Sequence, residues 1–149
     1  MLNKYARYEV LKTFLQKPTE NFGLREISRL SKLSPTSVIN YLKEFESGGL
    51  IIKEEKKGAP SYKASIENED FVFYEKISIL YELHSSGLID YLWQKLSPHV
   101  IILYGSHSKG EATENSDIDI FIIGKEKEIA LQEFEKKLGR EIHLIFDDN

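Results

Sequence analysis

Residues 99–123 read HVIILYGSHSKGEATENSDIDIFII, and this stretch carries the strongest fold signal in the chain. The continuous apolar run at 99–104 is typical of a buried strand, and the pattern at 117–123 predicts a second strand. A helical spacing of apolar residues over 125–138 and a third strand over 140–146 follow. We therefore expect an α+β chain whose C-terminal part is a small mixed sheet with helices on one face.

Two aspartates stand on the second predicted strand. Side chains alternate between the faces of a strand, so Asp117 and Asp119 project from the same face. The isoleucines that alternate with them enter the core on the other face: Ile118, Ile120 and Ile122. Two carboxylates about 7 Å apart repel each other, a cost that is tolerated where a divalent cation lies between them. The pair therefore predicts a metal site.

Gly105 and Ser106 directly follow the first strand of this region. Backbone amides and a hydroxyl at such a turn can cradle phosphate oxygens. An anion cradle and carboxylates that leave Mg²⁺ free to bind a triphosphate are the parts that phosphoryl transfer needs. A surface Asp-x-Asp beside an unrelated Gly-Ser turn is the alternative explanation, because each piece alone is common.

The two pieces together resemble a known signature. Gly105-Ser106, ten intervening residues and then Asp117-Ile118-Asp119 are similar to the motif of the polymerase-β-type nucleotidyltransferase superfamily. The similarity is greatest to its small, minimal members from bacteria and archaea. It covers about residues 99–146 and includes Gly110 and Ser116.

This resemblance implies roles for individual residues. Gly105 and Ser106 would contact the phosphates of ATP or another nucleoside triphosphate. Asp117 and Asp119 would hold Mg²⁺ and act in catalysis. Lys109 takes the place of the arginine or other basic residue that is usual in the family, and would face the triphosphate as a point charge.

The last predicted strand departs from the family pattern. Active members usually carry a third carboxylate there, and His143 stands at that position. Glu141 lies two residues earlier and so on the same face. Three outcomes follow: Glu141 supplies the acid, His143 acts as base or ligand, or the site binds nucleotide without turnover. An imidazole suits softer metals better than Mg²⁺, so Mn²⁺ is a possible alternative ion.

The first 65 residues resemble a winged helix-turn-helix. Apolar spacing and turn residues predict three helices, at 3–15, 24–30 and 35–47, and a hairpin of strands at 50–53 and 61–64 joined by a long polar loop. Ser34 is a good N-cap with Pro35 at the first helical position, and Gly48-Gly49 ends the third helix. The resemblance implies a module of the kind found in bacterial and archaeal transcription regulators.

In that architecture the third helix enters the major groove of DNA with its N-terminal end. The candidate DNA-binding residues are Thr36, Ser37, Asn40 and Lys43 on this helix, and Lys56 and Lys57 at the wing. Residues 1–65 hold 12 basic and 7 acidic residues, a net charge of +5, which suits a polyanion. Winged helices also serve as dimer or protein-docking modules, and that alternative remains open.

Residues 66–98 are expected to form a helical connector rich in aromatic side chains. A dimer seam and packing between the two domains explain those aromatics equally well. The predicted organisation is thus a winged-helix domain at 1–65, the connector, and a nucleotidyltransferase-like domain at 99–149. Residues 66–149 carry 8 basic and 17 acidic residues, a net charge of −9.

Composition narrows the remaining classes. The chain has 149 residues, a net charge of −4 and no cysteine, which excludes disulfides, thiol nucleophiles and cysteine-bound zinc. No apolar run is long enough to span a membrane, and no secretory signal is apparent at the N-terminus, so we expect a cytoplasmic protein with no membrane partner.

Two function classes remain open. The first is an enzyme that transfers a nucleoside monophosphate, most simply AMP from ATP, to an acceptor hydroxyl. In the minimal transferases that this chain resembles, the acceptor can be a tyrosine of a HEPN-type toxin, with the transferase acting as antitoxin. The second is a DNA-binding transcription regulator whose transferase-like domain is weak or inactive and serves nucleotide binding or dimerisation. A homodimer is the assembly that would let a winged helix read a palindrome.

Overall fold

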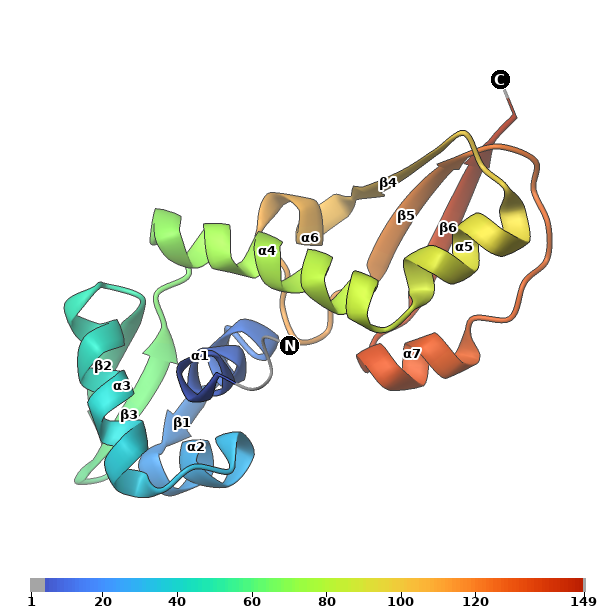
Figure 1. Ribbon diagram of the computed structural model, residues 1–149. Coiled ribbons are helices and arrows are strands. Elements are labelled where there is room, and N and C mark those ends of the chain that lie inside the picture. The colour runs from blue at the N-terminus through green and yellow to red at the C-terminus, as the bar shows by residue number, and fades with distance from the viewer. Residues whose placement is uncertain (1–4, 149) are drawn as a thin grey trace. The chain divides into compact units, whose positions relative to one another are not determined.

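The structure is a computed structural model that describes residues 5–148, and its chain divides into two compact units, Met1–Tyr74 and Glu75–Asn149 (Figure 1). The boundary falls inside helix α4 (Glu69–Ser85), so the residues expected to form a connector are shared between the two units. None of the described helices is long and apolar enough to cross a membrane.

Unit 1 combines three helices with a three-stranded antiparallel sheet. Its elements are α1 (Ala6–Gln16), β1 (Asn21–Gly23), α2 (Leu24–Ser31), α3 (Pro35–Ser47), β2 (Ile51–Lys56) and β3 (Ala59–Ala64), with strand order β1-β3-β2. The helices bury their apolar faces in one core with the sheet, built around Phe14, Phe22, Ile27 and Phe45. The start of the first helix that we expected at Asn3 lies outside the described residues.

The predicted third helix is confirmed at both ends. Ser34 is the N-cap, and its side chain accepts a hydrogen bond of 3.3 Å from the Ser37 N–H. Pro35 occupies the first helical position. Gly49, with φ of +72°, adopts the left-handed conformation just beyond the end of the helix.

The predicted hairpin is correct in kind, but its loop is shorter than expected. Strands β2 and β3 pair from Ile51↔Ala64 to Lys56↔Ala59, which leaves Lys57 and Gly58 as the turn. Both have positive φ, 53° and 76°, as a two-residue hairpin turn requires. Charged residues continue β2 up to the turn, because residues 55–60 at the end of the hairpin are exposed to solvent. Strand β1 was not expected from the sequence, since only three residues form it.

Unit 2 is built on a second three-stranded sheet. Its elements after α4 are α5 (Leu88–Leu96), β4 (Val100–Tyr104), α6 (Gly105–Lys109), β5 (Ile118–Ile123), α7 (Gln132–Leu138) and β6 (Ile142–Asp147). In the order β4-β5-β6, β4 is antiparallel and β6 parallel to β5, so the sheet is mixed as predicted. Ile118, Ile120 and Ile122 enter the core with side chains of α4 and α5, also as predicted.

Helices cover only one face of this sheet. Residues of α4, α5 and α7 pack in the same cluster as Ile101, Ile120 and Ile142. The opposite face, which we call the open face, carries Val100 and Ile102 of β4 at 40% and 42% exposure and Ile145 of β6 at 50%.

Three sequence expectations for unit 2 need correction. The run at 99–104 is not a buried strand, because β4 is an edge strand with one side on the open face. The helix expected over 125–138 begins only at Gln132, since the charged residues 125–128 are exposed and make no apolar face. Gly105 and Ser106 begin the short helix α6 instead of forming a simple turn.

Candidate active site

The site is formed where paired residues of three neighbouring strands lie side by side across the sheet. Tyr104 at the end of β4 pairs with Asp119 of β5, and Asp119 pairs with His143 of β6. Asp119 alternates with buried isoleucines and His143 follows the buried Ile142, so both side chains stand on the open face. The strand register therefore places an acid and an imidazole side by side.

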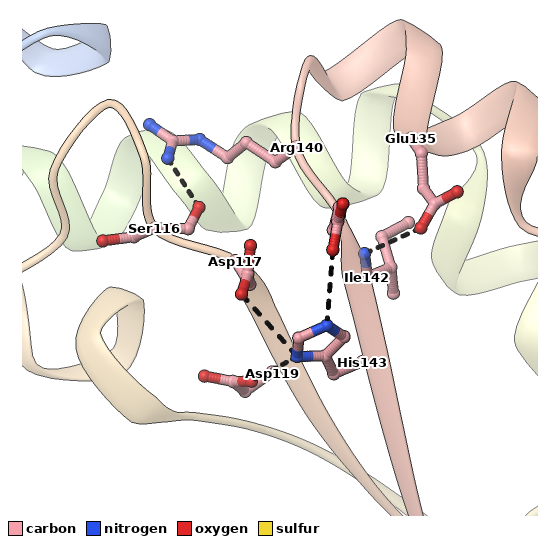
Figure 2. Close-up of polar contacts among 8 residues, drawn as sticks. Ser116, Asp117, Asp119, Glu135, Arg140, Ile142 and His143 are labelled. Carbon is pink, nitrogen blue, oxygen red and sulfur yellow. Dashed lines mark hydrogen bonds and ion pairs between the residues drawn. The ribbon is translucent and has the colours of Figure 1, made fainter.

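Asp117, Asp119, Glu141 and His143 are brought together by this register. His143 Nδ1 lies 3.5 Å from Asp119 Oδ1 and 3.8 Å from Asp117 Oδ2. Its Nε2 lies 3.7 Å from Glu141 Oε2. Figure 2 shows Asp117 and Asp119 on the same side of the imidazole, next to Nδ1. All four residues that we predicted as catalytic are thus neighbours.

The cluster is accessible to solvent. The side chains of Asp117 and His143 are 43% and 52% exposed, and that of Glu141 is 78% exposed. One ligand atom each of Asp117, Glu141 and His143 lies within 4.8 Å of the other two. Carboxylate oxygens with an imidazole nitrogen are a donor set that divalent cations accept, so these residues fit a bound metal ion.

Gly105 lies directly against Asp119. A Cβ at position 105 would overlap the Asp119 carboxylate oxygen, and φ is +73°, so glycine is required there for two reasons. Ser106 is half-buried and Lys109 is exposed at the end of the same helix. The Ser108 hydroxyl donates to the Gly105 carbonyl at 2.8 Å, which fixes the first turn of α6.

Arg140 holds the loop that leads to Asp117. Its Nη1 donates to the carbonyls of Thr113 and Ser116 at 2.7 and 2.8 Å. Figure 2 shows the contact with Ser116. Burial lowers the pKa of Arg140, and the acids Glu82 and Glu75 of α4 act against that shift. The sequence analysis missed this residue, although a basic side chain directly before the third strand was a signal that could have found it.

Two buried titratable groups beside Arg140 were also missed. Burial raises the pKa of Glu75 to about 7, with Arg140 opposing the shift. Burial and then Arg140 lower the pKa of His107 to about 4, and its Nε2 has no hydrogen-bond partner among the described residues. Because nothing in a sequence pattern reports such burial, no local signal marks either residue.

The predicted DNA-binding residues all belong to unit 1. Thr36, Asn40 and Lys43 are exposed on α3. Ser37 is half-buried, and its hydroxyl lies 3.0 Å from that of Ser34, so it takes part in the helix cap. The two wing lysines are exposed, Lys56 at the end of β2 and Lys57 in the turn.

The family comparison concerns unit 2. Residues 86–147 match the family model described as "Nucleotidyltransferase domain". The match runs from α5 to β6, includes the whole acid and imidazole cluster, and does not extend to residues 1–85. No curated protein and no solved structure matches the chain significantly. This match supports nucleotidyl transfer as the general activity of unit 2, an activity that generally uses a divalent metal and a nucleoside triphosphate, and the acid and imidazole cluster fits such a metal.

Proposed function

We propose that unit 2 transfers a nucleoside monophosphate, AMP from ATP, to a hydroxyl group of a partner protein. The observation that carries this proposal is the convergence of Asp117, Asp119, Glu141 and His143 beside Gly105 in the matched domain. Carboxylates and an imidazole can bind a metal ion and accept a proton. Nucleotidyl transfer requires both functions from the side chains of its active site.

The metal, Mg²⁺ or Mn²⁺, would be held by Asp117 and Asp119, and would neutralise charge on the triphosphate when bound. The absence of a side chain at Gly105 lets the Asp119 carboxylate lie directly against the backbone at the start of α6, where phosphate oxygens would bind. Ser106 offers a hydroxyl to the phosphates, and Lys109 offers a cation. In the transfer step the acceptor oxygen bonds to the α-phosphorus, the bond to pyrophosphate breaks, and Glu141 or His143 takes the acceptor proton.

The acceptor is a separate molecule in this proposal. The cluster is solvent-accessible and stands on the uncovered face of a small sheet, so the unit does not enclose a substrate of its own. A partner protein could supply both the hydroxyl and the missing wall. A HEPN-type toxin is the partner class that the sequence resemblance favours, and the chain would then act as its antitoxin.

We further propose that unit 1 is a winged helix that binds DNA and regulates transcription of its own operon. The succession of three helices and a hairpin supports this proposal, with α3 capped and exposed at Thr36 and Asn40. The proposed wing carries Lys56 at the end of β2 and Lys57 in the turn, and both can contact phosphates. DNA, a protein acceptor and a second copy of the chain are therefore the partners to test.

Label transfer from ATP tests the enzyme. The full chain is incubated with [α-³²P]ATP, Mg²⁺ or Mn²⁺ and a candidate acceptor protein, and label on the acceptor is measured. We expect transfer that is lost in Asp117→Ala and kept in Asp90→Ala, an exposed position on α5. Equal transfer by Asp117→Ala would contradict the assignment of the site.

One observation favours the second candidate function. His143 Nδ1 lies 3.5 Å from Asp119 and 3.8 Å from Asp117, and His143 stands where the family pattern has a third acid. An imidazole in that place could leave a domain that binds nucleotide without turnover and serves a DNA-binding regulator. ATP binding without label transfer under either metal ion would favour this alternative.

A further inference from the structure

We propose that His143 and Glu141 join the metal site of Asp117 and Asp119, and that this site binds a first-row transition-metal dication in preference to Mg²⁺. This inference concerns the site of the proposed function and rests on that function only for the reaction that the metal would serve. It starts from the one side chain that departs from an all-carboxylate site, His143.

The separations within the cluster suit a shared ion. Asp117 lies 3.8 Å from Nδ1 of the imidazole and Glu141 lies 3.7 Å from Nε2, and both distances are too long for good hydrogen bonds. A single ion binds only one of the two nitrogens, but one ligand atom each of Asp117, Glu141 and His143 lies within 4.8 Å of the other two. Neighbouring ligands around a dication lie about 3 to 3.5 Å apart, because each metal–ligand bond is about 2.1 Å long. Rotation of these exposed side chains would bring the ligand atoms to that spacing, and solvent or phosphate oxygens can complete the coordination.

The backbone under these ligands is fixed. The Ile118 N–H donates to the Glu141 carbonyl at 2.8 Å, which joins the two strands between Asp117 and His143. The Ile142 N–H donates to Glu135 Oε1 at 3.0 Å, so α7 anchors the start of β6 (Figure 2). Arg140 holds the carbonyl of Ser116, the residue before Asp117. Only side-chain rotation is therefore needed to form the site.

The donor atoms of these side chains determine which metal ion the site prefers. Mg²⁺ binds oxygen ligands in strict octahedral geometry and keeps much of its water. An imidazole in place of a carboxylate therefore weakens the binding of Mg²⁺. Mn²⁺ and the later first-row dications accept imidazole nitrogen together with carboxylate oxygen. The imidazole among the carboxylates therefore shifts the metal selectivity of the site away from Mg²⁺.

Metal binding without nucleotide tests this inference. Dissociation constants of Mn²⁺ and Mg²⁺ are measured by calorimetry for the full chain, for His143→Asp and for the matched control His84→Asp, an exposed histidine on α4. We expect the ratio of the Mg²⁺ to the Mn²⁺ dissociation constant to fall roughly tenfold in His143→Asp and to stay unchanged in His84→Asp. As a second readout, Mn²⁺ should broaden the ring NMR signals of His143 before those of His84 and His99.

An unchanged ratio in His143→Asp, or failure of the wild type to bind either ion while circular dichroism shows it folded, would overturn the inference. His143 signals that are no more sensitive to Mn²⁺ than those of the other histidines would do the same. Label transfer that fails while the ratio shifts as expected removes the transferase proposal and leaves the metal site standing. Label transfer with an unchanged ratio removes only the metal preference.

Discussion

Gly105 lies against Asp119, and both the lack of space and the backbone conformation at this position require glycine. Any side chain at position 105 would push the Asp119 carboxylate away from His143, and its φ of +73° is unfavourable for residues with a Cβ. The residue therefore shapes the site without offering a functional group to it.

We predict that Gly105→Ala abolishes nucleotide transfer and lowers the free energy of unfolding by about 2 to 3 kcal/mol, from left-handed strain plus overlap with Asp119. Urea denaturation and the label assay measure the two effects. Gly139→Ala is the matched control, because Gly139 has φ of +68° but nothing within 4 Å of its Cβ position. It should lose only about 1 kcal/mol and keep activity. Equal losses in the two variants would contradict the proposed contact.

Side-chain direction made part of the site predictable from single residues. Alternation along a strand puts Glu141 on the face of His143, and in the same way the three-residue motif Asp117-Ile118-Asp119 puts its two aspartates on one face. Arg140 and His107 could not be found in that way, since their importance comes from burial and from carbonyls that a loop brings back to them. Local periodicity contains no information on such long-range contacts.

Among the elements, α3 and the strands β5 and β6 were predictable because strong local signals mark them. Ser34 and Pro35 mark the start of α3, and alternating isoleucines mark β5. The short elements β1 and α6 were not predictable, because three and five residues are too few to show a period. The exposure of β4 was also missed, since an apolar run does not tell an edge strand from a central one.

The end of the β2–β3 hairpin, the wing of the proposed winged helix, allows a prediction about DNA binding. If Lys56 and Lys57 each neutralise a phosphate, replacing both should lower the slope of log affinity against log salt by about 2. Lys56→Gln with Lys57→Asn is the suitable pair, because asparagine tolerates the positive φ of position 57. Fluorescence anisotropy on duplex DNA between low and moderate salt measures the slope. Lys125→Gln with Lys136→Gln, two exposed lysines of unit 2, should leave it unchanged. An unchanged slope in the wing variant would remove the wing from the DNA interface.

For the molecule as a whole, unit 1 has a net charge of +2 (12 basic and 10 acidic residues) and unit 2 a net charge of −6 (8 basic and 14 acidic residues). The basic first part of the chain lies in unit 1 and the acidic part mainly in unit 2, where carboxylates gather around the candidate site. The basic unit 1 suits a polyanionic partner such as DNA. The acidic unit 2 suits a metal cation that is bound together with a nucleotide. This division was visible in the sequence, whereas the boundary within α4 was not, because a continuous helical pattern runs through it.

Folding stability should depend on pH through two buried groups with opposite signs. The pKa of Glu75 is raised from 4.5 to about 7, so its contribution to stability is present below pH 4.5 and is lost as pH rises through 7. The pKa of His107 is lowered from 6.5 to about 4, so its contribution is present above pH 6.5 and is lost as pH falls towards 4. The two effects partly cancel between these limits, and a variant of one group is needed to reveal either.

We therefore predict that Glu75→Gln becomes more stable relative to the wild type as pH rises from 4 to 8. The neutral amide cannot acquire the buried charge that Glu75 acquires near pH 7, and the change amounts to at most about 3 kcal/mol. Denaturation at each pH measures the difference between variant and wild type. Glu69→Gln, at an exposed position in the first turn of the same helix, should show no comparable trend. Parallel curves for Glu75→Gln and wild type across this range would mean that Glu75 is charged in the folded protein without cost, and that Arg140 compensates its burial fully.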